Sequence, residues 1–165
     1  MIVSAHWGME DTRKYNQDQQ AAAELMAESG ADLIIGTGPH VLQEAMSIET
    51  SDGRTVPVWY SLGNLYSSQL KIDELTGGVA KMHISLQDSK PVFSDIKFYP
   101  TFMSYDWPKE DQQAERIETR SNLTLTPLAH ADKHIRKLFP DESVESRYQM
   151  VTETLAGNLN VTIVR

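Results

Sequence analysis

The sequence predicts an α/β protein: a mixed sheet with a parallel βαβ core, antiparallel hairpins and C-terminal helices. Three observations lead to this fold class. Residues 33–35 form a short, unbroken apolar run, which is typical of a strand buried on both faces. An earlier apolar run at residues 2–5 and a helical pattern between the two complete a strand–helix–strand unit. Two pairs of extended runs follow, and two helical patterns close the chain.

Composition limits the class of protein. A chain of 165 residues, 40% hydrophobic and 23% charged, is expected to fold as one domain over residues 1–165. No apolar run approaches the ~20 residues of a membrane-spanning helix, so we expect a soluble chain. The absence of cysteine excludes disulfides and thiolate ligands. A net charge of −8 argues against nucleic acid as a partner, although a bound metal ion would still admit an anionic substrate.

The first strand is expected at Ile2–Ala5, and it ends in His6-Trp7-Gly8. A helix then begins after Asn16, which serves as N-cap, with Gln19 at the reciprocal position of a capping box. Gly30 is placed to end this helix. The residues expected to face the sheet recur at helical spacing, and they are Ala22, Leu25, Met26 and Ser29.

The second strand, at residues 33–35, stops at the turn Gly36-Thr37-Gly38-Pro39, and His40 follows at once. Parallel strands joined by a helix end on the same edge of a sheet, where open α/β sheets bind their ligands. We therefore expect the imidazoles of His6 and His40 to project toward one pocket. The alternative is that the glycine-rich segment is only a turn and that His40 caps it.

The next two extended runs, residues 41–49 and 56–62, are joined by a turn that contains Asp52-Gly53, a strong hairpin signal. The second run ends in Gly63-Asn64. Two interpretations of Asn64 stay open at this point. Its amide orients a ligand, or the residue merely adopts the left-handed backbone conformation that asparagine tolerates.

The second half of the chain begins with a loop at residues 67–76 and a hairpin of residues 77–87 and 90–99, with its turn at Asp88-Ser89. Alternation predicts that one face of the hairpin is buried and that His83 is solvated on the other. The residues of the predicted buried face are Ala80, Met82, Ile84 and Leu86.

The polar stretch Phe102–Asn122 is predicted to be a long mobile loop. Two helices are expected after it, at residues 128–138 and 144–155. His130 and His134 have the spacing of a shared helix face, but no third ligand accompanies them. We therefore expect solvated or packing roles for both.

Three segments that end strands carry a resemblance to a known family. They are His6-Trp7-Gly8-Met9-Glu10, the run from Asp32 to His40, and Tyr60-Ser61-Leu62-Gly63-Asn64. Together they resemble the CapA/PgsA family of capsule biosynthesis proteins, which is linked to poly-γ-glutamate and belongs to the calcineurin-like metallophosphatase superfamily. The resemblance is close over roughly the first 65 residues and loose over the hairpin that follows.

The resemblance implies a metallophosphatase-like fold and a set of site residues. His6 and His40 match metal-ligand positions of the family, and Glu10 and Asn64 match positions expected to act in catalysis, by contacting or orienting the substrate. A divalent metal, Mn or Zn, is implied in the full-length protein, where it would activate a water molecule. The implied substrate is an anionic polymer or a small molecule.

The chain departs from the family pattern at two points. Gly38 stands where the family has a histidine, and the family's earlier Gly-Asp and Asn-Asn-His segments have no counterpart. We therefore interpret the chain as the C-terminal part of a CapA-like domain. Two imidazoles are fewer than the three or four protein ligands usual for zinc, so we expect this fragment alone to bind no metal and to be inactive.

Two functional hypotheses follow, and the sequence leaves open whether the protein is an enzyme. The first is a region of a bacterial CapA-like protein of capsule or poly-γ-glutamate biosynthesis with a metallohydrolase-type site. The second is a non-catalytic binding or assembly module of a cell-surface polymer export system. For both, the resemblance implies an extracytoplasmic, cell-surface location, partners among the other synthesis proteins, and membrane attachment only through an N-terminal anchor outside this chain.

Overall fold

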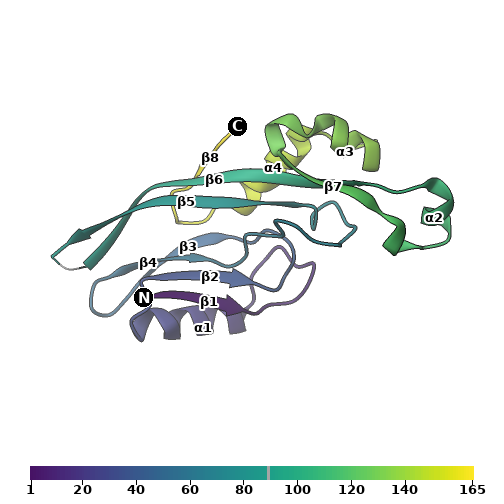
Figure 1. Cartoon of the computed structure of the whole chain (residues 1–165). Helices are drawn as coiled ribbons and strands as arrows, with labels where there is room; N and C mark the ends of the chain where they lie inside the picture. The colour runs from purple at the N-terminus through teal and green to yellow at the C-terminus, as the bar shows by residue number, and fades with distance from the viewer. Residues whose placement is uncertain (89) are drawn as a thin grey trace.

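The computed structural model describes residues 1–88 and 90–165 and contains two sheets that pack face to face (Figure 1). The first sheet has the strand order β1-β2-β4-β3. Strand β1 (Ile2–His6), β2 (Leu33–Thr37) and β4 (Thr55–Trp59) are parallel, and β3 (Ala45–Glu49) is antiparallel to β4. Helix α1 (Gln17–Glu28) covers the outer face of this sheet. The predicted βαβ unit is confirmed.

Helix α1 begins as its sequence predicts. The Asn16 side chain accepts the backbone N–H of Gln19, and the Gln19 side chain accepts the N–H of Asn16. Gly30 follows the helix with φ +103°, as expected of a residue that ends a helix. The predicted packing face, however, is wrong at Leu25, whose side chain is 68% exposed.

The residues of α1 that are buried instead are Gln19, Ala23 and Ala27. Alanine side chains let the helix approach the sheet closely, and the amide of Gln19 finds a buried partner. The apolar stripe that contains Ala22, Leu25 and Met26 is therefore rotated away from the centre of the sheet.

The hairpin of β3 and β4 is confirmed, with Ser47 opposite Pro57 and Gly53 in the turn at φ +76°. Its β4 strand is buried on both faces from Val56 to Trp59, as a central strand of a layered fold must be.

The second sheet consists of β5 (Thr76–Gln87), β6 (Lys90–Asp106), β7 (Ser121–Pro127) and the short β8 (Thr162–Ile163). Strands β5 and β7 are antiparallel to β6, and β8 is parallel to it. The predicted hairpin is thus confirmed, except that Ser89 of its turn lies outside the described residues. The antiparallel hairpin belongs to a sheet of its own, which the sequence did not indicate.

The alternation predicted for β5 holds only in the half near the core. Ala80 and Met82 pack against the core, whereas Ile84 is 48% and Leu86 is 73% exposed. The register shifts between Lys81 and His83, and beyond this bulge the hairpin is no longer covered by the first sheet. His83 is exposed, as predicted.

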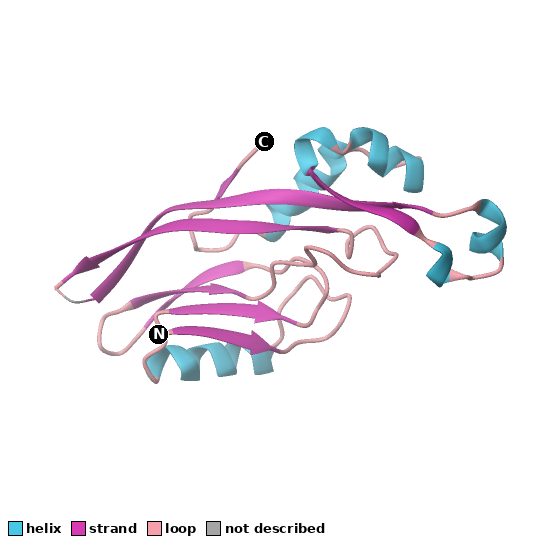
Figure 2. Cartoon of the chain, viewed as in Figure 1, coloured by secondary structure: helices cyan, strands magenta, loops and turns pink. Residues whose placement is uncertain are grey.

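The loop predicted for Phe102–Asn122 is wrong. Strand β6 continues to Asp106, and Phe102, Met103 and Tyr105 are buried. Helix α2 (Lys109–Gln113) and a 3-10 turn (Ile117–Thr119) then form an arm that leads into β7 (Figure 2). The Arg120 guanidinium lies over the rings of Tyr105 and Trp107. These cation–π contacts order a segment whose sequence is mostly polar.

The C-terminal helices are confirmed. A 3-10 turn (Leu128–His130) leads into α3 (Asp132–Leu138), and α4 (Val144–Thr154) follows. His130 lies in the 3-10 turn and is exposed. His134 lies in α3, where its Nδ1 is 3.0 Å from the Ser104 hydroxyl, so it has the expected packing role.

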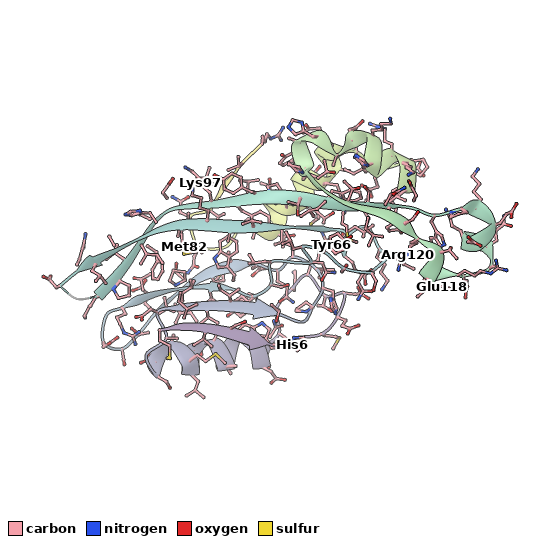
Figure 3. All side chains as sticks on the ribbon, in the orientation of Figure 1. His6, Tyr66, Met82, Lys97, Glu118 and Arg120 are labelled. Atoms are coloured by element: carbon pink, nitrogen blue, oxygen red, sulfur yellow. The ribbon has the colours of Figure 1, made fainter. Side chains whose placement is uncertain are left out.

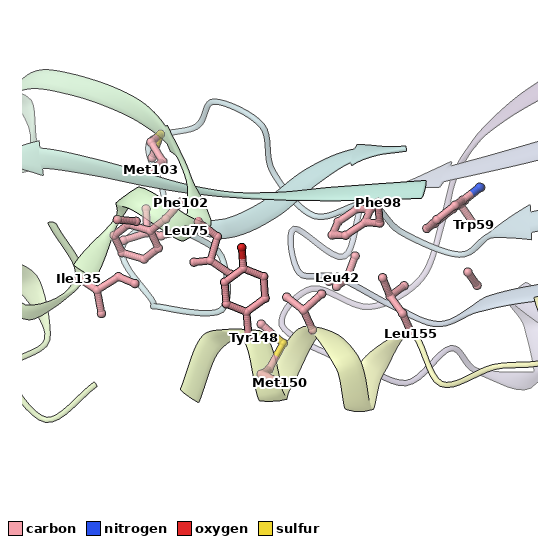
Figure 4. Close-up of a cluster of buried hydrophobic side chains, with 14 of the residues drawn as sticks. Leu42, Trp59, Leu75, Phe98, Phe102, Met103, Ile135, Tyr148, Met150 and Leu155 are labelled. Atoms are coloured by element: carbon pink, nitrogen blue, oxygen red, sulfur yellow. The ribbon is translucent and has the colours of Figure 1, made fainter. Parts of the chain in front are cut away.

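Two apolar clusters hold the layers together. The larger lies between the two sheets and α4, where Trp59 stacks on Phe98 with ring centroids 5.8 Å apart (Figure 4). The smaller joins α1 to the first sheet through Ala23, Ala27 and Ile34. The α/β class with parallel core, antiparallel hairpins and terminal helices is confirmed, and the assignment of one domain over residues 1–165 stays a prediction. No described helix is long and apolar enough to cross a membrane.

Candidate functional site

The candidate site lies at the carboxyl ends of β1, β2 and β4, where three loops meet. Trp7 donates its backbone N–H to the Thr37 carbonyl at 2.9 Å, and Asp11 donates to the Pro39 carbonyl at 2.9 Å. The loop after β1 is therefore fixed along the loop after β2. Figure 3 shows His6 at this end of β1.

Two glycines make this close approach feasible. A Cβ atom at Gly36 would lie 2.1 Å from the Tyr60 carbonyl oxygen, and one at Gly38 would lie 2.4 Å from the Trp7 carbonyl oxygen. Gly38 also has φ +117°, a conformation that L-residues with a side chain rarely adopt. The backbone of this turn leaves no room for the histidine that the family pattern has at position 38.

His40 is held in one orientation by Asn64. Its Nδ1 lies 3.0 Å from Asn64 Oδ1, and Asn64 Nδ2 donates to the Glu74 carbonyl at 3.1 Å. Since the amide nitrogen is committed to that carbonyl, its oxygen must accept, and His40 must donate from Nδ1. The lone pair of a neutral His40 is thereby placed on Nε2.

Glu10 lies on the other side of the ring. His40 Nε2 is 3.9 Å from a carboxylate oxygen of Glu10, and the Glu10 side chain is 74% exposed. Glu10, His40 and Asn64 thus come together at this edge. The side chain of Asn64 does so by hydrogen bonding. The left-handed conformation is adopted instead by His40, with φ 62°, and by Asp11, with φ 61°.

His6 lies on the same edge of the sheet, but its neighbours differ from those of His40. It is exposed, and its Nδ1 is 3.4 Å from the Thr37 hydroxyl, directly across the β1–β2 ladder. His40 has Asn64 and Glu10 as neighbours. Within residues 1–88 and 90–165, no three His, Asp or Glu side chains form a group that could hold a metal ion. The roles assigned to His6, Glu10, His40 and Asn64 stay predictions.

Sequence reasoning missed an ion pair beside the site. Lys71 binds the Asp11 carboxylate, and this hydrogen bond holds the pKa of Asp11 below its usual range and raises that of Lys71. Sixty positions separate Asp11 from Lys71, so no local pattern could have paired them.

A buried pair of glutamines, also missed, supports the loop that carries Glu10. Gln19 Nε2 donates to Gln43 Oε1 at 2.9 Å, and Gln43 Nε2 donates to the carbonyls of Thr12 and Lys14. Both glutamines are almost fully buried. The available signal was a glutamine at position 43 in the middle of an apolar run.

Comparison with known proteins finds a family that matches the residues of this site. Residues 1–69, which contain all three strand-end segments, match the family described as "Bacterial capsule synthesis protein PGA_cap". This part of the chain is similar to the bacterial capsule synthesis protein family.

Two curated relatives are similar to the same part of the chain. The PGA biosynthesis protein CapA of Bacillus subtilis (strain 168) is 39% identical over 69 residues, which is 42% of this chain and 17% of the relative. The capsule biosynthesis protein CapA of Bacillus anthracis is 38% identical over 69 residues, or 42% of this chain and 16% of the relative. The matched part therefore spans about a sixth of either relative.

The match confirms the resemblance carried by the three segments. The matched residues include the first sheet, α1 and the loops of the site, and they end at Gln69, just before Lys71 and Glu74. The second sheet and the C-terminal helices lie outside the match.

Proposed function

We propose that this chain is a region of a bacterial CapA-like protein of capsule or poly-γ-glutamate biosynthesis, and that its functional centre is the edge where Glu10, His40 and Asn64 meet. The proposal is supported by the family match over residues 1–69 and by the names of the two relatives. The three motifs that carry the match are also the three that converge in space.

One observation carries the proposal. Asn64 fixes His40 with its Nδ1 as donor, which leaves Nε2 directed toward Glu10. An imidazole oriented by a hydrogen bond to its other nitrogen is the usual arrangement for a proton acceptor or a metal ligand. A role as a turn cap alone does not account for the hydrogen bond between His40 and the Asn64 amide, or for the bond that the same amide donates to the Glu74 carbonyl.

We further propose that this chain supplies only part of a divalent-metal site. His6 and His40 would be its ligands for Mn or Zn, which are suited to imidazole nitrogen, and such a metal would activate water. We propose that the remaining ligands of this site come from elsewhere in the protein, and that the 165-residue chain alone binds no metal and lacks hydrolase activity.

A second candidate function is a non-catalytic binding or assembly module of a cell-surface polymer export system. The observation in its favour is Gly38, which stands at a family histidine position where the backbone admits no side chain. For either candidate we propose an extracytoplasmic location, an anionic polymer or small molecule as ligand, and the other capsule or polyglutamate synthesis proteins as partners.

A chimera tests the proposal. Residues 1–69 of this chain would replace the matched 69 residues of the Bacillus subtilis relative, in a strain that lacks the relative's own gene. We expect the chimera to restore polymer production. His40→Ala and Asn64→Ala in the chimera should abolish production at unchanged protein level, and Gln20→Ala, an exposed position on α1, should not.

The two candidates predict different results. Full polymer production by the His40→Ala chimera would exclude a catalytic or metal-binding role and would favour the assembly module. Loss of production in the Gln20→Ala control would show that the chimera reports folding rather than the site.

A further inference from the structure

Residues 70–75 form a turn that leads into β5 and carries the anchor of the candidate site. The buried Glu74 side chain accepts the backbone N–H groups of Leu70 and Lys71, at 3.1 Å and 2.7 Å, which gives the turn a fixed shape. The backbone carbonyl of Glu74 accepts the Asn64 amide. A displacement of this turn therefore moves the acceptor on which the Asn64 amide, and with it the imidazole of the site, depends.

The turn is held from behind by a buried arginine of helix α4. Arg147 Nη1 donates to Asp73 Oδ1 at 2.7 Å, and the side chain of Arg147 is only 9% exposed. The other carboxylate oxygen of Asp73 lies 3.6 Å from Nε of Arg13. Arg13 belongs to the loop after β1, the same loop that carries Glu10. Asp73 therefore links α4, the turn and the loop after β1.

The surroundings of Arg147 on α4 are apolar, since Tyr148, Met150 and Val151 are all buried. Moving a guanidinium out of water costs free energy that one ion pair seldom returns in full, so an apolar side chain of similar size would stabilise the helix at least as well. Nε of Arg147 is 3.5 Å from a Glu142 oxygen and has no hydrogen-bond partner within the described residues. This environment favours a positioning role for the arginine over a stabilising one.

We propose that Arg147 is a positioning residue of the candidate site. Through Asp73 it holds the turn in the place from which the Glu74 carbonyl reaches the Asn64 amide. The contact thereby determines which nitrogen of His40 carries the proton. Helix α4 is then part of the site, although the match to the family ends before the turn. The inference rests on the proposed function only for the importance of His40, because the tautomer is a property of the folded chain.

Long-range ¹⁵N–¹H NMR of the 165-residue chain tests the proposal through the ratio of the two neutral forms of His40. In the wild type we expect the Nδ1–H form to be the major one. Arg147→Met keeps the apolar stem and removes the guanidinium. It should shift the ratio toward the Nε2–H form by about threefold or more, because the hydrogen bonds that orient the ring are weakened. Asp73→Ala, at the partly exposed partner, should do the same and decides the matter if Arg147→Met does not fold.

Two comparisons separate positioning from a general loosening of the fold. Leu155→Ala removes a buried side chain at the C-terminal end of α4, so it should lower the urea midpoint and leave the His40 ratio unchanged. In an Asn64→Ala chain the link from the imidazole to the turn is already absent. Adding Arg147→Met to that chain should therefore cause no further shift in the ratio.

The possible results separate clearly. A wild-type ratio in the folded Arg147→Met and Asp73→Ala chains overturns the proposal. An equal shift in Leu155→Ala overturns it as well, and so does a further shift when Arg147→Met is added to Asn64→Ala. If the chimera with His40→Ala makes polymer at the full level while Arg147→Met still shifts the ratio, the proposed function fails and the positioning role stands.

Discussion

His40 Nδ1 lies 3.0 Å from Asn64 Oδ1, although 24 positions separate the two residues in the chain. The Asn64 amide is itself held by the Glu74 carbonyl, so a backbone group of a third segment determines which nitrogen of His40 is protonated. These two hydrogen bonds link the loops after β2 and β4, and they leave the unprotonated Nε2 of a neutral His40 directed toward Glu10.

Asn64→Ala is expected to change the tautomer of His40. Without the Oδ1 acceptor, no hydrogen bond from Asn64 stabilises the tautomer with the proton on Nδ1. The Nε2–H form of the neutral imidazole then becomes the major one. Long-range ¹⁵N–¹H NMR of the ring nitrogens measures the ratio of the two forms. The exposed His83 serves as internal reference. An unchanged His40 spectrum in Asn64→Ala would mean that the hydrogen bond does not form in solution.

Gly38→Ala is expected to destabilise the fold by more than Gly53→Ala. Both glycines have positive φ, which costs a residue with a side chain about 1–2 kcal/mol. A Cβ at Gly38 also meets the Trp7 carbonyl oxygen at 2.4 Å, whereas one at Gly53 meets nothing within 4 Å. Urea unfolding of the two variants measures the difference. Equal losses of unfolding free energy would show that the turn at Gly38 adjusts to a side chain at little cost in free energy. Gly38→His would then be tolerated too.

Gln43→Leu is expected to lower the free energy of unfolding by about 2–4 kcal/mol, because it leaves the Gln19 amide and two loop carbonyls without their buried partner. Amide hydrogen exchange should rise in residues 10–15 in particular. Gln20→Ala, on the exposed side of α1, is the matched control and should change neither quantity. Unchanged exchange in that loop would contradict the role given to the glutamine pair.

Stability is expected to fall below pH 4 in part through Asp52. Hydrogen bonds from Thr50 and Arg54 lower the pKa of Asp52 to about 2, from an ordinary value near 3.8. A depressed pKa means that the ionised group stabilises the fold above its unfolded-state pKa and that this contribution is lost as the pH falls toward 2.

Asp52→Asn should therefore flatten the decline in urea midpoint between pH 4 and pH 2, starting from a lower midpoint at pH 6. Asp141→Asn, an exposed position between α3 and α4, controls for the loss of one negative charge. A decline in Asp52→Asn as steep as in the wild type would place the acid sensitivity in other carboxylates.

Local patterns in the sequence determined much of the first half of the fold. The Asn16–Gln19 capping box, the Asp52-Gly53 turn and the apolar runs of β1 and β2 depend on residues that are near one another in the chain. The parallel pairing of β1 with β2 then follows from the helix between them, which is why the sequence also predicts His6 and His40 on one edge. Glu10 and Asn64 were added by the family resemblance.

Long-range contacts decided what the sequence could not. The segment after Phe102 reads as a loop because its order comes from burial against the first sheet and from Arg120 packed on Tyr105 and Trp107. The buried face of α1 consists of Ala23, Ala27 and Gln19, whose amide bonds Gln43, and its centre is not the predicted apolar stripe. The orientation of His40 depends on an amide and a carbonyl from two other loops, and only the packed chain brings such groups within hydrogen-bonding distance.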